Sequence, residues 1–323
     1  MKVAVIGTWH VHTKEYAEAI KNNPLSTLAC CWDDNEERGR AFAGEMDIPF
    51  VKDISDIWND KSIDSIQVTT ATAIHKDILI SAAKSGKNIF TEKVLALTNE
   101  DAQEIKDAVE KSGKVFTISF PHRTFPALLA AKEILDSGAL GEITYARAHN
   151  YHDGSIAGWL PDTFYDANET GGGAMIDLGA HPMYCLKWFL GNPVSMVSMF
   201  TSVTKRPVED NAVTVIELEN GAIGVSETGF VTTGNPHIIE LSGTLGSLLV
   251  HYGKIEYCSK KTTDSQWVSL DKMPEKLPLP VDQWIDSVVN AAPVTFGIDD
   301  AVSLTEFMTG AYEAHKAGKK YIF

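Results

Sequence analysis

The chain opens with Met1-Lys2-Val3-Ala4-Val5-Ile6-Gly7-Thr8-Trp9-His10-Val11-His12, a short apolar, β-branched run followed at once by a glycine turn. Such a run is typical of a buried strand, and residues 12–21 behind it have helical periodicity. A glycine at the junction allows a tight turn, and the free amides at the helix start then face any anion held there. This strand, turn and helix predict a dinucleotide-binding unit, although only the first glycine of the G-x-G-x-x-G pattern is present.

The first third of the chain repeats this alternation of short apolar runs and helical segments. Strands alternating with helices of this length indicate parallel pairing with right-handed crossovers, which gives a doubly wound α/β sheet. We expect strands at 1–6, 26–32, 65–69, 88–91 and 114–120, and helices at 12–21, 35–45, 74–84 and 99–111.

The pattern changes beyond Pro121. Residues 194–268 contain successive strands with turn signals between them, which favours an antiparallel sheet. We therefore expect an amino-terminal Rossmann domain with a doubly wound parallel sheet at residues 1–121. A carboxyl-terminal α+β domain with a large, mostly antiparallel open sheet is expected at 122–323. Its other elements are predicted as helices at 125–135, 173–190, 281–290 and 299–316 and a strand at 143–150.

Charge and cysteine content limit the partners and the compartment. Lys and Arg number 28 against 43 Asp and Glu, a net charge of −15, which repels nucleic-acid backbones and anionic lipid surfaces. The four cysteines form no C-x-x-C pair, no apolar run approaches the ~18 residues of a membrane span, and the start lacks signal-peptide features. The sequence thus predicts a cytoplasmic protein with neither a nucleic-acid nor a membrane partner.

Asp33 ends the second predicted strand, where an acid accepts a hydrogen bond from the ribose 2′-hydroxyl of a dinucleotide and repels a 2′-phosphate. NAD is therefore favoured over NADP. The alternative is that Asp33 or Asp34 caps the helix that begins at Asn35.

Two further segments carry residues suited to proton transfer. Glu92-Lys93 ends a parallel strand, and Asp177 and His181 lie one helical turn apart behind the glycine run 171–173. Oxidation of a carbinol requires a group that takes the hydroxyl proton; histidine suits this task, while Lys and Asp hold and polarise hydroxyl groups. The structural alternative makes Asp177 a charge near a helix start and His181 a half-buried histidine with its hydrogen bonds satisfied.

The order of these motifs resembles the Gfo/Idh/MocA family, that is, oxidoreductases of the glucose-fructose oxidoreductase, inositol dehydrogenase and rhizopine-catabolism type. The motifs that carry the resemblance are Gly7-Thr8, Asp33, Thr69-Thr70-Ala71-Thr72-Ala73-Ile74-His75, Glu92-Lys93, Arg123, the turn 138–141 and the segment from Gly171 to His181. The resemblance implies a nicotinamide cofactor and a small polyhydroxylated substrate. Four positions depart from the usual pattern: Val94 stands in place of a proline, Pro121 in place of an asparagine, and Trp9 and His12 in place of glycines.

The resemblance also implies roles for single residues. Lys93 corresponds to the lysine that contacts the nicotinamide region and the reacting hydroxyl, His181 to the general acid/base, and Asp177 to its partner in holding the substrate. The expected cofactor-binding residues are Gly7, Thr8, Trp9, His10, Val11, Asp33, Asp34, Thr70, Ala71, His75, Glu92 and Lys93. The expected substrate-binding residues are Lys93, Arg123, His149, His152, Trp159, Asp177 and His181, although Trp159 is equally compatible with loop packing. No metal site is expected, because the spacing of His149, His152, Asp177 and His181 matches no metal motif.

The leading hypothesis is an NAD-dependent oxidoreductase that interconverts a secondary alcohol and a ketone on a sugar, cyclitol or sugar derivative. One alternative uses a transient oxidation to assist glycosidic cleavage or elimination, and another is a cofactor or sugar sensor without turnover. The resemblance further implies a homodimer or homotetramer associated through the exposed face of the antiparallel sheet.

Overall fold

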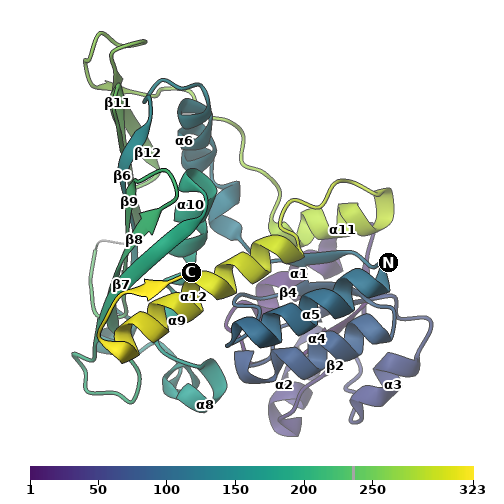
Figure 1. Cartoon of the computed structure of the whole chain (residues 1–323). Coiled ribbons are helices and arrows are strands. Elements are labelled where there is room, and N and C mark those ends of the chain that lie inside the picture. Colours follow the sequence, from purple (N-terminus) through teal and green to yellow (C-terminus); the bar gives the residue numbers. More distant parts are fainter. Residues whose placement is uncertain (235–236) are drawn as a thin grey trace. The chain divides into compact units, whose positions relative to one another are not determined.

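The computed structural model describes residues 1–234 and 237–323, and the chain divides into two compact units (Figure 1). The first unit contains residues 1–119 and 278–305, and the second contains residues 120–277 and 306–323. Residues 278–305 thus belong with the amino-terminal part of the chain, whereas the sequence-based division at residue 121 assigns them to the second domain.

The first unit is built on a five-stranded parallel sheet of order β2-β1-β3-β4-β5. All residues of β3 are buried, as expected of a sheet covered on both faces by helices. This arrangement confirms the predicted doubly wound sheet. The strands are β1 (Lys2–Ile6), β2 (Thr27–Trp32), β3 (Ser65–Val68), β4 (Asn88–Thr91) and β5 (Phe116–Ile118), and the helices are α1 (Thr13–Asn22), α2 (Glu36–Met46), α3 (Ile54–Asn59), the 3-10 turn η1 (Thr72–Ile74), α4 (His75–Lys84) and α5 (Asn99–Ser112).

Helix α11 (Pro280–Asn290) explains why residues far along the chain join the first unit. It begins on a proline, which suits the first turn of a helix. Its apolar face places Val281, Trp284 and Ile285 in one buried cluster with Val3 and Phe90 of the parallel sheet. Periodicity predicts this amphipathic helix but does not say which apolar surface it covers. The next helix, α12 (Ile298–Ala317), begins in the first unit and ends in the second.

The second unit contains a nine-stranded sheet of order β13-β12-β11-β10-β6-β9-β8-β7-β14. Among the described strands of this sheet, only β6 and β9 pair in parallel, which confirms the predicted, mostly antiparallel sheet. The strands are β6 (Ile143–Tyr151), β7 (Pro193–Thr201), β8 (Asn211–Leu218), β9 (Ile223–Gly229), β10 (His237–Gly243), β11 (Gly246–His251), β12 (Lys254–Ser259), β13 (Val268–Ser269) and β14 (Tyr321–Ile322). The helical elements that precede β7 are η2 (Pro121–Thr124), α6 (Pro126–Asp136), α7 (Gly154–Ala157), η3 (Asp162–Tyr165), α8 (Ala167–Thr170), α9 (Ala174–Asp177) and α10 (Ala180–Leu190).

The helix predicted at 173–190 is interrupted, so it forms the two elements α9 and α10. Proline has no amide hydrogen and is tolerated only in the first turn of a helix. Pro182 is the third residue of α10, and Leu178 and Gly179 form a turn before that helix starts. Asp177 therefore ends α9 while His181 lies in the first turn of α10, rather than both on one continuous helix.

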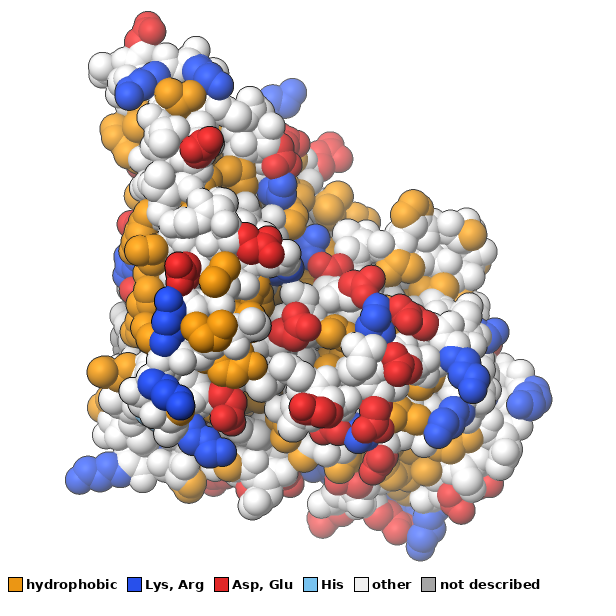
Figure 2. Space-filling model, viewed as in Figure 1, with side chains coloured by type: hydrophobic (Ala, Val, Ile, Leu, Met, Phe, Trp, Pro, Cys, Tyr) orange, Lys and Arg blue, Asp and Glu red, His pale blue; other side chains and the backbone are white. Residues whose placement is uncertain are grey.

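The two faces of the nine-stranded sheet differ. Asn150 of β6 is in register with Thr228 of β9, whose hydroxyl donates to the Ala174 carbonyl of α9 at 3.4 Å, so this face is covered by helices. The opposite face carries exposed apolar side chains, and Figure 2 shows hydrophobic side chains gathered at the left of the view, where β7 and β8 lie. The exposed residues of this face, here called the open sheet face, include Val197, Met199, Val213, Val215 and Ile223.

No helix in the described part of the chain is both long enough and apolar enough to span a membrane.

Trp284 tests the packing of α11. The side chain is fully buried, and its indole nitrogen is buried without a hydrogen-bond partner among the described residues. We expect Trp284→Ala to lower the free energy of unfolding by about 3–5 kcal/mol. Trp284→Phe keeps an aromatic ring and removes the unpaired N–H group with part of the indole, so we expect it to cost less than the alanine variant. Urea titration measures both, with the half-exposed Trp267→Ala as the control; equal costs for the two Trp284 variants would contradict the assignment.

Candidate active site

The loops that follow β1 and β3 meet at the carboxyl edge of the five-stranded sheet. Gly7 follows β1 with φ +79°, and a Cβ atom there would lie 2.3 Å from Cγ2 of Thr70. Thr69 Oγ1 donates to the Gly7 carbonyl at 2.7 Å, and the His10 amide donates to the Thr69 carbonyl at 3.2 Å. Only glycine has room for this close approach at a positive φ. The single fingerprint glycine that the sequence retains is thus the one that the turn requires.

Asp33 lies at the end of β2 and ties the turn after β1 to α2. Its Oδ2 accepts the amide and the hydroxyl of Thr8, both at 2.6 Å, and Arg38 donates to Oδ2 and Oδ1 at 3.1 and 2.7 Å. Burial on its own would raise the pKa of Asp33, but these donors hold it below its ordinary value. Asn35 caps α2 by accepting the Arg38 amide at 3.0 Å, so neither Asp33 nor Asp34 is the cap. Arg38 also donates to Asp34 at 2.7 Å.

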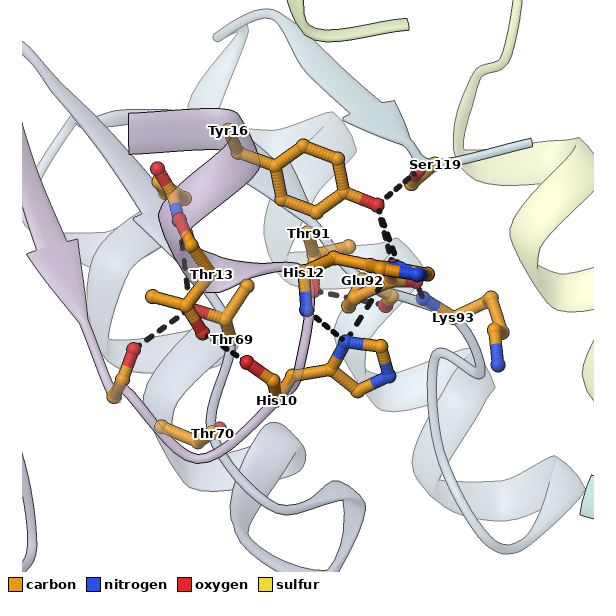
Figure 3. Close-up of polar contacts among 12 residues, drawn as sticks. His10, His12, Thr13, Tyr16, Thr69, Thr70, Thr91, Glu92, Lys93 and Ser119 are labelled. Atoms are coloured by element: carbon orange, nitrogen blue, oxygen red, sulfur yellow. Dashed lines mark hydrogen bonds and ion pairs between the residues drawn. The ribbon is translucent and has the colours of Figure 1, made fainter. Parts of the chain in front are cut away.

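Glu92, which directly follows β4, is a buried carboxylate surrounded by hydrogen-bond donors (Figure 3). Its Oε1 lies 2.9 Å from His12 Nδ1 and accepts the Tyr16 hydroxyl at 2.5 Å, while its Oε2 accepts the Lys93 amide at 2.6 Å. The Nδ1 atom of His10 is 3.8 Å from Oε1. Burial on its own would raise the pKa of Glu92, but the charges of His10, His12 and Lys93 and the His12 hydrogen bond hold it well below its ordinary value.

The ligating atoms of His10, His12 and Glu92 all lie within 4.8 Å of one another. Two imidazoles and a carboxylate suit Zn²⁺. However, both Glu92 oxygens already accept hydrogen bonds, and the Tyr16 hydroxyl continues the network to Ser119 Oγ at 2.9 Å. These hydrogen bonds hold the loop after β1 in place and explain why the three side chains lie together. We therefore assign no metal to the cluster.

The residues at this edge fit a dinucleotide. Gly7 lets the turn after β1 pack against Thr70, and α1 begins directly behind this turn, with the positive end of its dipole toward it. The Oγ1 atom of Thr70 is buried and has no hydrogen-bond partner within residues 1–234 and 237–323. Val11 is 51% exposed at the end of the turn, and Trp9 lies half-buried beside it.

His75, predicted from the sequence to bind the cofactor, joins two loops of the first unit. Its Nδ1 contacts the Val94 carbonyl at 2.9 Å and its Nε2 contacts the Thr70 carbonyl at 3.2 Å, so the ring holds the loops after β3 and β4 together. Burial lowers its pKa, while these carbonyls oppose the change. Ala71 is buried in the same loop. Direct contact of Ala71 or His75 with a cofactor stays a prediction.

In the second unit, the glycine run before α9 lets backbone segments approach closely. A Cβ atom on Gly172 would lie 2.0 Å from the Tyr312 hydroxyl, and one on Gly173 would lie 2.0 Å from the Glu209 carbonyl. Glu209 Oε1 accepts the amides of Gly173 and Met175 at 2.9 and 3.0 Å and the Tyr312 hydroxyl at 2.6 Å. Glu209 thereby anchors the start of α9, which carries Asp177 at its other end.

His181 is buried and held from two sides. Its Nδ1 lies 2.8 Å from the Tyr184 hydroxyl, which also accepts the His122 backbone amide at 3.1 Å. The His122 ring stacks on the His181 ring with centroids 4.2 Å apart and planes inclined by 16°. Tyr184 fixes one edge of the imidazole and His122 covers one face, so the ring orientation is set before any ligand binds.

The predicted substrate-binding residues do not share one surface of the second unit. Successive residues of a strand point to opposite faces, and Asn150 lies on the helix-covered face. His149 therefore points to the other face, where its Nδ1 lies 3.6 Å from Glu227, and it is not brought onto the face that carries α10 and His181. Arg147 donates to both Glu227 oxygens at 3.0 and 2.7 Å. His149 is part of this ion-pair cluster.

The loop after β6 packs on itself and on Phe230, the residue that follows β9. The His152 ring stacks on Phe230 with centroids 4.8 Å apart, and its Nδ1 accepts the Gly154 amide at 3.1 Å. Trp159 packs against His152 and donates to Asp153 at 3.2 Å, yet its side chain is 56% exposed. Trp159 thus has a packing role and also an exposed ring surface that a sugar could contact.

Arg123 lies in η2, with its guanidinium carbon 5.1 Å from the centre of the Trp188 ring.

Four residues of the site were not predicted from the sequence: His122, which precedes Arg123, and Tyr184, Glu209 and Arg38. Two of them carry a usable signal: His122 follows the last parallel strand, and Tyr184 lies three residues after His181 on a helix, where side chains meet. The pairing of Glu209 with the glycine run has no local signal, because the partners are far apart in sequence.

Comparison with known proteins supports the motif-based resemblance. Residues 1–120 match the oxidoreductase family with an NAD-binding Rossmann fold, and residues 128–249 match the GFO/IDH/MocA carboxyl-terminal domain. The chain is 26% identical over 320 residues to scyllo-inositol 2-dehydrogenase (NAD(+)) of Bacillus subtilis strain 168, covering 94% of this chain and 91% of that protein. It is 28% identical over 255 residues to D-glucoside 3-dehydrogenase of Escherichia coli K12, covering 71% and 70%.

The fold is also shared with a solved structure, levoglucosan dehydrogenase in complex with NADH and L-sorbose. That structure superposes with a TM-score of 0.87 at 19% identity and covers 100% of this chain and 98% of its own. The two domain matches together span most of the chain, and they occur in the order that the fold requires. The resemblance drawn from the sequence motifs is thus confirmed: this chain belongs to the GFO/IDH/MocA family of oxidoreductases.

Proposed function

We propose that this protein is an NAD-dependent oxidoreductase that interconverts a secondary alcohol and a ketone on a sugar, a cyclitol or a sugar derivative. The observation that carries the proposal is the buried imidazole of His181, whose orientation is fixed by Tyr184 and His122. The names of the relatives are consistent with it, since they include an inositol, a glucoside and a levoglucosan dehydrogenase.

The proposed catalytic roles of His181, Lys93 and Asp177 follow from the chemistry of these side chains. NAD, when bound, supplies the hydride acceptor. In the neutral tautomer that carries its proton on Nδ1 and donates it to the Tyr184 hydroxyl, the unprotonated Nε2 atom of His181 takes the hydroxyl proton. The Lys93 ammonium stabilises the negative charge that develops on the same oxygen, and the Asp177 carboxylate accepts a hydrogen bond from a neighbouring hydroxyl. In ketone reduction the same groups act in reverse.

The cofactor contacts proposed for the first unit follow from its loops. The turn from Gly7 to Val11, which includes Thr8, Trp9 and His10, would contact the pyrophosphate, and Thr70, Ala71 and Glu92-Lys93 would line the nicotinamide side. Asp33 and Asp34 lie where the adenosine ribose is expected. An ionised Asp33 disfavours a 2′-phosphate, which supports NAD over NADP.

The remaining substrate contacts are proposed on the second unit. Arg123, His152 and Trp159 are candidates for binding hydroxyl groups and for stacking on the apolar face of a sugar ring. We propose no direct substrate contact for His149, because it lies on the other face of the sheet.

We further propose that the protein is a homodimer or homotetramer that associates through the open sheet face. Contiguous exposed apolar side chains on a sheet are typical of such interfaces.

A cytoplasmic location is supported by the cysteines, of which Cys30, Cys31 and Cys185 are free and buried. The net charge of −15 supports a protein without nucleic-acid or membrane partners.

The central test is NADH formation with a panel of polyols, inositols and glycosides, using NAD and NADP separately. We expect His181→Ala and Lys93→Ala to lower kcat by about 10²- to 10⁴-fold, because each removes a group that acts in the transition state. NADH binding should change by no more than a few-fold. His251→Asn, a change outside the proposed site, serves as the control. Turnover near the wild-type rate in both variants would exclude the assignment, and release of a free sugar without net NADH would instead indicate redox-assisted cleavage.

Asp33→Ala tests cofactor selection. The substitution removes the carboxylate and leaves Arg38 without that partner, so a 2′-phosphate meets a guanidinium instead of an acid. We expect the ratio of kcat/KM for NAD to that for NADP to fall at least about tenfold. Glu37→Ala, an exposed acid on the same helix, should leave the ratio unchanged. An unchanged ratio in Asp33→Ala would show that Asp33 serves only to hold the loop.

Met199→Glu tests the proposed association. Met199 is 72% exposed on the open sheet face, and a charge there opposes burial against a second copy. Light scattering coupled to size-exclusion chromatography should show the wild type as an oligomer and the variant shifted toward the monomer. Ile156→Glu, an exposed apolar position off the sheet, should keep the wild-type mass. A wild type that elutes as a monomer would refute the association.

A further inference from the structure

A cavity of about 570 Å³ lies in the second unit, within the size range of small-molecule sites. Its walls come from η2, the start of α6, strands β6, β10 and β11, the turn after β11, and the loop around Met273. Its apolar lining includes Phe125, Leu128, Val250 and Met273.

The lining carries no formal cation or anion from Lys, Arg, Asp or Glu among the residues that the structure describes. The lining residues with polar side chains are Asn150, Tyr252, His122 and His237, and the Tyr252 hydroxyl donates to the Gly234 carbonyl at 2.6 Å. Burial lowers the pKa of His237 to about 4, with His149 adding to the effect, so this ring is neutral at physiological pH. Its buried Nε2 atom has no hydrogen-bond partner in the described part of the chain.

The cavity adjoins His181 through a single ring. His122 lines the cavity, stacks on His181 at 4.2 Å, and meets the His237 ring edge-on with centroids 4.7 Å apart. Asn150 lies on the helix-covered face of β6, the face that carries α10. Because His122 both lines the cavity and stacks on His181, a group bound in the cavity would lie next to the ring that covers His181.

We propose that this cavity is a substrate subsite that takes an uncharged, largely apolar substituent, an alkyl or aryl aglycone, attached to the sugar ring whose hydroxyl reacts at His181. This proposal rests on the proposed function and names its substrate class as glycosides rather than free polyols. The absence of Lys and Arg from the described lining excludes recognition of a phosphate or carboxylate in the cavity, because burial of an anion there would find no counter-charge. The few polar groups give the aglycone an orientation, as in other mainly apolar pockets.

The test measures binding and turnover separately. Calorimetry of the NADH-loaded protein compares phenyl and methyl β-D-glucopyranoside with D-glucose 6-phosphate, and NADH-formation assays with NAD give kcat/KM for the same compounds. Met273→Asp places a charge in the cavity from a loop position outside any helix or strand, which limits damage to the fold. Leu277→Asp, an exposed position in the same loop that does not line the cavity, is the matched control.

We expect the phenyl glycoside to bind at least about tenfold more tightly than the methyl glycoside, because more apolar surface is buried. Met273→Asp should remove that difference, Leu277→Asp should keep it, and the 6-phosphate should bind more weakly than either. Equal affinity for the two glycosides, failure of both to bind, or a preference that survives Met273→Asp would overturn the proposal. Tighter phenyl binding that Met273→Asp abolishes, without any hydride transfer, would refute the proposed function while supporting the subsite.

Discussion

The buried carboxylate of Glu92 is the constraint around which the first unit is organised. An ionised group with only 2% of its side chain exposed is costly to bury unless donors surround it. The donors come from the loop after β1, from α1 and from the backbone of Lys93, so one charge fixes three segments at the carboxyl edge of the sheet. The position of Lys93 is consequently set by an electrostatic requirement of its neighbour.

Compensation of buried carboxylates by nearby donors also explains how an acidic chain can bind an anionic cofactor. The net charge is −15, yet the two buried acids nearest the dinucleotide loop are both compensated: Glu92 by His10 and His12, and Asp33 by Arg38 and the Thr8 donors. The local field at the loop is therefore less negative than the whole-chain charge implies. Backbone amides at the start of α1 need only overcome a distant, screened charge, which falls off over about 8–10 Å at physiological salt.

Local sequence rules account for most of the fold and for the single residues of the site, but not for their partners. Alternating runs predict every strand of the parallel sheet, and the periodicity of residues 281–290 predicts α11. That α11 covers Val3 and Phe90 is a contact across nearly the whole chain, which no local pattern encodes. For the same reason, the hydrogen bonds from Gly173 and Met175 to Glu209 cannot be predicted from the sequence. Pro182 is different, since its effect on the helix start is local and predictable.

Strand register decides which residues of β6 belong to the proposed site. Residue type favours His149, an imidazole beside a predicted pocket, over the neutral amide of Asn150. Because adjacent side chains alternate, a one-residue offset puts His149 into the Glu227 and Arg147 cluster and puts Asn150 into the wall of the cavity beside His122. A side chain with suitable chemistry is therefore insufficient evidence for a role in substrate binding. The face of the sheet, which requires knowledge of the β6–β9 pairing, selects between the two residues.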